Sequence, residues 1–203
     1  MTQLVYNPSA RSKLAPASRD YNSNWMTAVH MLQDDTFIGS DNALNLFVTK
    51  KQDLSQEDTI RMIPYGSFHL GQLVNRIRPG SIMMHKSDEE AVAKPELLYC
   101  TVSGSIGMVA SLSKDVYDLL HHIQNNLEHH VKASGKLSWS KFRSFKNSSR
   151  VHESQNFIDG EWVDEFTRLS VHDQTKILQD YDLCRFGSLQ DVTMLIEELG
   201  RLA

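Results

Sequence analysis

Apolar and polar side chains alternate along the first half of the chain, and this period of two predicts short β-strands. The first long run, residues 25–32, has largely apolar side chains at both odd and even positions, so we expect both faces of that strand to be covered. Turn residues such as Asp34 and Asp35 separate it from the next run, which indicates an antiparallel meander. Strands are expected at residues 25–32, 36–39 and 43–49, with irregular loops at residues 9–23 and 50–61.

A second group of alternating runs follows, separated by residues that interrupt strands. Ser103-Gly104-Ser105 can supply the positive φ of a tight hairpin, and residues 86–95 form a charged loop. Here strands are expected at residues 67–77, 81–85, 96–102 and 106–112.

Short strands in groups of three or four, with apolar residues on both faces, are typical of the blades of a β-propeller, although a β-sandwich gives a similar pattern. A closed propeller needs at least ~4 blades, whereas about two fit into these residues. The sequence therefore indicates a partial propeller, which is expected to be the end of something larger.

From residue 113 the spacing of apolar residues changes to three and four, which predicts helices. The clearest helix carries one apolar stripe, and Gly135 is placed to end it. The stripe consists of Val116, Leu119, Leu120, Ile123, Leu127 and Val131. The opposite face should lie in water, and it holds His121, Gln124, Asn125, Glu128 and His129.

Three later helices are marked by capping residues, Asp159, Ser170 and Ser188. Their expected buried faces are Trp162, Val163, Phe166 and Leu169; then Val171, Thr175, Leu178 and Tyr181; then Leu189, Val192, Leu195, Ile196, Leu199 and Leu202. The predicted fold class is thus β + α, with antiparallel meanders forming about two blades of an incomplete β-propeller over residues 1–112 and a small C-terminal helical domain over residues 113–203.

A connector at residues 136–151 interleaves aromatic with basic side chains. Such interleaving suits nucleic acid, but docking of the aromatics onto a core is the favoured interpretation. The formal net charge of −4 and the isoelectric point near 6.1 give no overall field that would attract a polyanion, so direct nucleic-acid binding is disfavoured. The local basic run consists of Lys141, Arg143, Lys146 and Arg150.

The sequence gives a few indications of the cellular compartment. The two cysteines, Cys100 and Cys184, lie far apart and fit reduced, packed thiols better than a disulfide. The first nine residues lack the order of a secretory signal, and no apolar run is long enough to span a membrane. We therefore expect an intracellular protein with no membrane partner.

Catalytic and metal-binding patterns are not evident in the sequence. Nine histidines include the doublets His121-His122 and His129-His130, but their spacing fits a solvated helix face better than a metal site. The nucleophile-elbow, phosphate-binding and dinucleotide motifs do not occur, and a pair of His69 with Cys100 is a weak candidate. The expectation is no catalytic residue, no metal ligand, no cofactor and no enzyme activity.

Specific segments over nearly the whole chain form a recognisable set. They are Asn24-Trp-Met26, Asp34-Asp35, Phe37, Gly39, residues 42–48, Phe68-His-Leu-Gly71, Val74-Asn75, Gly80-Ser81, Thr101-Val102, Gly104, Ile106-Gly107, Ser111-Leu-Ser113, Arg143-Ser-Phe145, Phe157-Ile-Asp-Gly160 and Glu197-Glu-Leu199. Together they resemble the cleavage and polyadenylation specificity factor A-subunit family, and above all its damage-binding branch. The Phe68-His-Leu-Gly71 segment and the Glu197-Glu-Leu199 ending favour that branch over the pre-mRNA relatives.

This resemblance implies a non-catalytic adaptor of a cullin-4 RING ubiquitin ligase in the nucleus and cytoplasm, acting in DNA repair and protein ubiquitination. The implied partners are WD40-type substrate receptors, including the damaged-DNA-binding subunit, so that DNA is met only indirectly. Cullin-4 would be held by propeller parts that these residues do not include. The alternative is a scaffold for pre-mRNA 3′-end processing or splicing, as in other members of the family.

The resemblance also implies where a receptor helix would bind. The family's cleft positions carry over to Trp25, Leu73, Asn75 and Val102, with Arg76 adjacent. A tryptophan and aliphatic residues can form an apolar groove for an amphipathic helix, and an asparagine can fix the register of that helix. Strand core is the alternative role of Trp25, and Arg76 departs from the apolar residue expected at its position.

Overall fold

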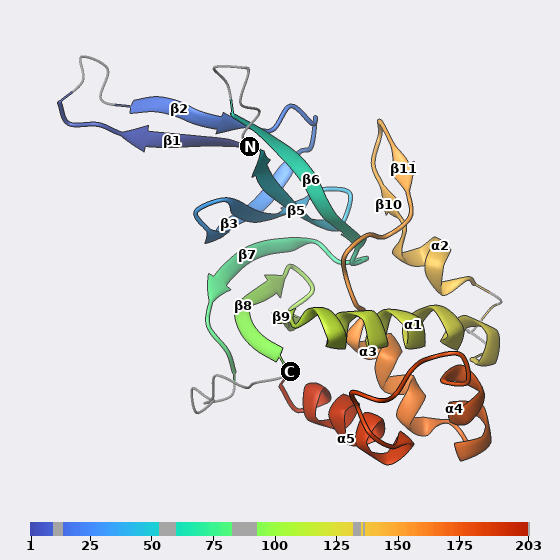
Figure 1. The fold of residues 1–203 in the computed structure, drawn as a ribbon. Coiled ribbons are helices and arrows are strands. Elements are labelled where there is room, and N and C mark those ends of the chain that lie inside the picture. Colours follow the sequence, from blue (N-terminus) through green and yellow to red (C-terminus); the bar gives the residue numbers. More distant parts are fainter. Residues whose placement is uncertain (10–13, 53–59, 83–92, 132–134, 136, 203) are drawn as a thin grey trace. The chain divides into compact units, whose positions relative to one another are not determined.

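The computed structural model describes residues 1–9, 14–52, 60–82, 93–131, 135 and 137–202 (Figure 1). The chain divides into two compact units whose segments interleave along the sequence. The first unit comprises Met1–Arg76, Thr101–Ser103 and Arg143–Asn156, and the second comprises Ile77–Cys100, Gly104–Phe142 and Phe157–Ala203. The expected domain limits, 1–112 and 113–203, stay a prediction.

Most of the first unit is one six-stranded sheet with the order β1-β2-β6-β5-β4-β3. Its strands are β1 (Thr2–Tyr6), β2 (Leu14–Arg19), β3 (Met26–Gln33), β4 (Thr36–Asp41), β5 (Asn45–Gln52) and β6 (Ile60–His69). Neighbouring strands from β3 to β6 are antiparallel, as the meander predicted, and β2 joins β6 through a short parallel pairing. A short hairpin, β10 (Phe145–Lys146) with β11 (Val151–His152), completes this unit.

Two expected loops in this sheet are wrong in part. Residues 9–23 include β2, whose alanines and Pro16 lack the alternation that marks a strand. In the expected loop at 50–61, Lys50 to Gln52 extend β5 and Ile60 begins β6, because both strands continue one ladder past the apolar stretch. Residues 53–59 lie outside the described part of the chain.

The expected strand at 67–77 is also wrong, because the chain turns in the middle of it. Gly71 has φ of 82°, and the Leu44 carbonyl accepts from the N–H groups of Leu70 (2.9 Å) and Gly71 (3.2 Å). The segment therefore divides between β6 and β7 (Val74–Pro79), which belong to different sheets.

Strand β3 corrects another expectation, that both of its faces are covered. It lies at an edge of the six-stranded sheet, and none of its residues is fully buried. Val29 and Met31 are 53% and 49% exposed. Apolar residues on both faces therefore predict the strand correctly, but they do not show that other parts of the chain cover those faces.

A second sheet has the order β7-β8-β9, with β8 (Ala93–Thr101) antiparallel to β9 (Ile106–Leu112). Gly104, in the turn between them, has φ of 92°, which confirms the positive φ expected there. Of the strand expected at 81–85, Ser81 and Ile82 are not in a strand, and residues 83–85 lie outside the described residues. The described end of the charged loop, Ala93 to Pro95, already belongs to β8.

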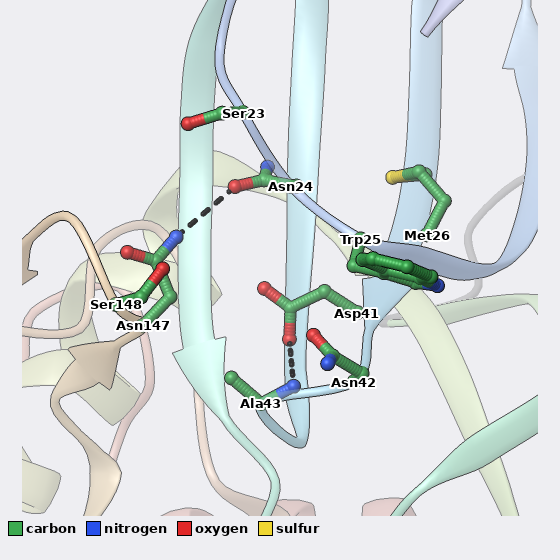
Figure 2. A pocket seen from close by; sticks show the side chains of 9 residues that line it. All are labelled: Ser23, Asn24, Trp25, Met26, Asp41, Asn42, Ala43, Asn147 and Ser148. Carbon is green, nitrogen blue, oxygen red and sulfur yellow. Dashed lines mark hydrogen bonds between the residues drawn. The ribbon is translucent and has the colours of Figure 1, made fainter.

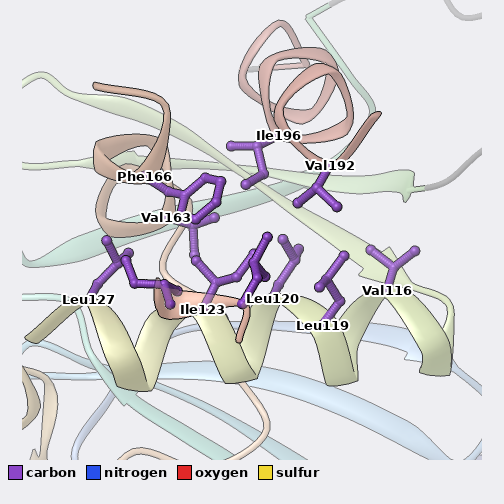
Figure 3. Close-up of a cluster of buried hydrophobic side chains, with 11 residues drawn as sticks. Val116, Leu119, Leu120, Ile123, Leu127, Val163, Phe166, Val192 and Ile196 are labelled. Carbon is purple, nitrogen blue, oxygen red and sulfur yellow. The ribbon is translucent and has the colours of Figure 1, made fainter. Parts of the chain in front are cut away.

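The helices of the second unit are α1 (Lys114–His130), α2 (Trp139–Arg143, of which Arg143 is counted with the first unit), α3 (Gly160–Asp164), the 3-10 helix η2 (Glu165–Arg168), α4 (Val171–Ile177) and α5 (Leu189–Gly200). The expected stripe of α1 is confirmed as the centre of a hydrophobic core. Figure 3 shows the α1 side chains pointing toward Val163, Phe166, Val192 and Ile196. Among the described residues no helix is long and apolar enough to cross a membrane.

Gln124 was expected in water, but its side chain is only 2% exposed. Its Oε1 accepts from the Asp159 N–H at 2.7 Å, and its carbonyl accepts from Trp162 Nε1 at 3.1 Å. Asp159 precedes α3 as predicted but makes no side-chain cap, because its Oδ2 accepts from Trp139 Nε1 at 2.8 Å instead. A buried polar cluster thus joins α1, α2 and α3.

Two further expectations in the helical segments are corrected. On α4, Val171 is 69% exposed while Gln174 and Ile177 are buried. The expected face was wrong because α4 ends at Ile177, so Leu178 and Tyr181 lie beyond the helix. Ser188 and Asp191 form the predicted capping box of α5. Both cysteines are free thiols, but Cys184 is exposed rather than packed.

The strand and helix content confirms the predicted fold class, β + α with a partial propeller and a helical part.

Candidate protein-docking site

Trp25 stands at the end of a tightly hydrogen-bonded turn, directly before β3. The Asp20 carboxylate accepts from the Asn22 backbone N–H (2.9 Å) and side-chain amide (2.7 Å), and the Asn22 carbonyl accepts from the Asn24 N–H (3.0 Å). The Trp25 carbonyl accepts from the Asn42 N–H at 2.9 Å. The backbone is therefore fixed while the indole is 78% exposed, which argues against strand core as its role.

Trp25 lines a surface hollow of about 660 Å³ in the first unit. Figure 2 shows Trp25 and Met26 on one side of the hollow and Asn147 and Ser148 on the other. The full lining is Ser23, Asn24, Trp25, Met26, Asp41, Asn42, Ala43, Asn147 and Ser148. One wall is therefore apolar and the other polar, as an amphipathic ligand would require.

Asp41 is 1% exposed and organises the β4–β5 turn below the hollow. Its Oδ1 accepts from the backbone N–H groups of Ala43 and Asn45, each at 3.0 Å, and both carboxylate oxygens accept from Asn45 Nδ2. These bonds satisfy the buried charge, so Asp41 serves the turn rather than offering a free carboxylate.

Asn45 connects these hydrogen bonds to His69, which is also buried. Asn45 Oδ1 accepts from His69 Nδ1 at 3.0 Å. Burial lowers the pKa of His69 below its ordinary value of 6.5, the positive charges of Lys146 and Arg143 lower it further, and Asp41 opposes them. The neutral form of the ring is therefore favoured.

The hairpin β10–β11 returns to this sheet from a distant part of the sequence. Arg143 Nη1 donates to the carbonyls of His69 (3.3 Å) and Leu70 (2.9 Å), and Asn45 Nδ2 donates to the Lys146 carbonyl (2.9 Å). Phe145 between them is fully buried. In the basic run, Arg143 thus binds through its guanidinium and Lys146 through its backbone carbonyl. The expected docking of the connector aromatics is confirmed for Phe145 and Trp139, which are buried, but is wrong for Phe142, which is 45% exposed.

The five residues proposed for receptor binding all lie in the first unit. Trp25 lines the hollow, whereas Leu73, Asn75, Arg76 and Val102 do not. Leu73 and Val102 are joined, since the Leu73 carbonyl accepts from the Val102 N–H at 2.9 Å. Val102 is 66% exposed, Asn75 and Arg76 are exposed and Leu73 is half-buried, so all five are accessible at least in part. Their role in binding stays a prediction.

Sequence reasoning missed the polar wall of the hollow. Asn147 and Ser148 lie in the turn of the β10–β11 hairpin, where Asn147 Oδ1 accepts from the N–H groups of Ser149 and Arg150, each at 2.9 Å. The Asn-Ser-Ser sequence is typical of such a turn and could have located it. Nothing in the sequence pairs this turn with Asn24, more than a hundred residues away.

Among the described residues, no group of three or more histidine, cysteine or acidic side chains is placed so that it could hold a metal ion. His122, in one of the doublets, instead bonds the Ile177 carbonyl through Nε2 at 2.9 Å. The buried carboxylate that lines the hollow, Asp41, is already hydrogen-bonded within its turn.

Residues 1–168 match the family described as the CPSF A subunit region. The chain is 37% identical over 187 residues to DNA damage-binding protein 1b of Arabidopsis thaliana, covering 91% of this chain and 17% of that protein. It is 35% identical over 201 residues to DNA damage-binding protein 1 of Oryza sativa subsp. japonica, covering 98% and 18% respectively. DNA damage-binding protein 1 of Solanum lycopersicum is 36% identical over 187 residues, or 91% of this chain and 17% of that protein.

These relatives bear out the resemblance found in the sequence, and the chain spans less than a fifth of their length. The family match covers both the strands and the first helices, including Trp25, Leu73 and Val102. The chain therefore belongs to the CPSF A subunit family and is similar, within it, to the DNA damage-binding protein 1 members.

Proposed function

We propose that this chain is a non-catalytic, protein-binding part of a cullin-4 RING ubiquitin ligase adaptor that receives a helix of a WD40-type substrate receptor. The observation that carries the proposal is the 35–37% identity to DNA damage-binding protein 1 across most of the chain. In this proposal the adaptor acts in DNA repair and protein ubiquitination, in the nucleus and cytoplasm. It meets DNA only through the damaged-DNA-binding subunit.

The surface around Trp25 supports docking of a helix. An indole that is 78% exposed beside a hollow gives a large apolar contact that a partner can desolvate, and tryptophan is enriched among residues that dominate binding energy. Outside the lining of the hollow, Val102 is a second exposed apolar side chain, and its N–H donates to the Leu73 carbonyl. The exposed Asn75 amide and Arg76 guanidinium can pair with polar groups at the edge of a helix.

In this proposal cullin-4 is held by propeller parts that these residues do not include, as the family resemblance implies. This assignment predicts that the chain binds a receptor without cullin-4 and does not bind cullin-4 alone.

A second candidate is a scaffold in pre-mRNA 3′-end processing or splicing, which the family description favours. Affinity capture from nuclear extract separates the two. Recovery of WD40-type receptors supports the adaptor, and recovery of polyadenylation or splicing subunits supports the alternative. Loss of the captured receptors in the double variant Trp25→Ala, Leu73→Asp is expected, while retention of those receptors would contradict the docking site.

A further inference from the structure

We infer that the β10–β11 hairpin, through Asn147 and Arg150, holds the Trp25 turn in the conformation that docks a partner. This inference rests on the proposed function, because it concerns the same surface. It assigns positioning roles to two residues that neither the sequence patterns nor the resemblance placed at the site.

The first observation is a set of hydrogen bonds between segments about 125 residues apart, which we call the latch. Arg150 Nη1 donates to Asn22 Oδ1 at 2.9 Å, and Arg150 Nη2 donates to Asn24 Oδ1 at 3.5 Å. Asn147 Nδ2 donates to the same Asn24 oxygen at 3.2 Å. The latch thus binds Asn22 and Asn24, which lie three residues and one residue before Trp25.

The second observation is that the hairpin side of the latch is itself rigid. The Asn147 N–H donates to the Arg150 carbonyl at 3.0 Å, and the Arg150 N–H donates back to Asn147 Oδ1 at 2.9 Å. The Arg150 guanidinium lies 4.9 Å from the ring centre of Phe145, which is fully buried and stacks on His152 at 4.8 Å. An arginine that is already fixed loses little further freedom when it binds the asparagines.

The hairpin is also tied to the sheet at its base. Backbone bonds run both ways between Ser67 and Gln155, at 2.9 and 2.8 Å, and Asn156 Nδ2 donates to the Tyr65 carbonyl. Movement of the hairpin tip relative to β6 is therefore restricted, and the latch transmits that restriction to residues 22–24.

The third observation is that packing alone does not hold Trp25. Its indole is mostly exposed, so its position depends on the backbone of its turn. Within that turn, Asn24 Nδ2 is buried and finds no acceptor among the described residues, which indicates that Asn24 is oriented by its oxygen and hence by the latch. A preorganised docking residue lowers the entropic cost of binding, so loss of the Arg150 bonds should weaken binding without removing a residue that lines the hollow.

The test is a titration of the 203-residue chain with the purified damaged-DNA-binding subunit as the WD40-type receptor. Arg150→Ala should raise the Kd about tenfold, and Asn147→Ala, which keeps the arginine, about threefold, since hydrogen bonds to charged groups contribute more than neutral ones. Lys146→Ala is the matched control, because it removes the same charge from the same hairpin but no latch bond, and it should leave the Kd unchanged.

A second readout follows the Trp25 indole directly by its ¹H–¹⁵N heteronuclear NOE. Arg150→Ala should lower this NOE for Trp25 and leave those of Trp139 and Trp162 unchanged. An unchanged Trp25 NOE in both Arg150→Ala and Asn147→Ala would overturn the inference, and so would a Lys146→Ala effect on the Kd as large as that of Arg150→Ala.

The two readouts separate this inference from the proposed function. If the receptor binds Trp25→Ala as tightly as the natural chain, the proposed docking site is wrong, but a fall of the Trp25 NOE in Arg150→Ala still supports the latch. If Trp25→Ala abolishes binding while Arg150→Ala and Asn147→Ala bind normally, the docking site holds and the positioning role is refuted.

Discussion

Replacing Gln124 by alanine should destabilise the helical core, although the spacing of residues on α1 places this position in water. The side chain is 2% exposed, and its Oε1 accepts from the backbone N–H of Asp159 at 2.7 Å. Loss of that acceptor in the interior costs about 1–3 kcal/mol. Loss of one buried methylene adds about 0.8 kcal/mol. The free energy of unfolding should therefore fall by about 2–4 kcal/mol.

Urea denaturation followed through tryptophan signals measures this change. Trp139 and Trp162 are stacked with ring centres 5.8 Å apart, so their near-ultraviolet dichroism reports on this cluster. With a slope near ~2 kcal/mol/M, the urea midpoint should fall by about 1–2 M. Asn125→Ala, on the exposed face of the same helix, is the control and should change stability by less than about 0.5 kcal/mol. Equal midpoints for the two variants would refute the assignment of Gln124 to the core.

Three further predictions concern pH and packing. The pKa of His69 is lowered in the folded state, so the unfolded chain binds more protons as the pH falls below 6.5. The free energy of unfolding should therefore drop below pH 6.5 and level off below the folded pKa. His69→Gln should flatten this drop in urea titrations at several pH values, and an unchanged pH dependence would contradict the prediction. Hydrogen bonds from the backbone N–H and hydroxyl of Ser188 lower the pKa of Asp191. The contribution of Asp191 to folding stability is therefore present above pH 3.8 and is lost as the pH falls through its folded pKa. Asp191→Ala should lower the Tm at pH 7 but should leave it unchanged well below that pKa. Phe145→Ala should cost about 3–5 kcal/mol, and a loss under about 1 kcal/mol in urea would disprove its role as the anchor of the hairpin.

Local patterns predicted much of the fold because their causes are local. The stripe on α1 and the capping box at Ser188 both depend on side chains three or four residues apart, and both are confirmed. The break between β6 and β7 was missed, because it depends on the Leu44 carbonyl holding residues 70 and 71 from another turn. Gln124 was misplaced for a similar reason, since its partners lie on α3.

The residues of the candidate site were likewise predicted only in part from the sequence. Trp25 was found through the segment Asn24-Trp-Met26 and is exposed beside a hollow. Asn147 and Arg150 were not found, because their bonds to residues 22 and 24 depend on a hairpin that returns to the sheet from beyond two helices. Sequence spacing carries no information about such contacts, whereas the family resemblance identified the relatives that the comparisons bear out.

Binding of a receptor helix at the surface around Trp25 can be measured by isothermal titration of the purified damaged-DNA-binding subunit into the 203-residue chain, with Trp25→Ala, Leu73→Asp as the variant. Loss of a dominant tryptophan contact costs at least about 2 kcal/mol, so the Kd should rise by about 30-fold or more, with the α-helical dichroism unchanged. Equal Kd values for the natural chain and the folded variant would show that this surface does not bind the helix.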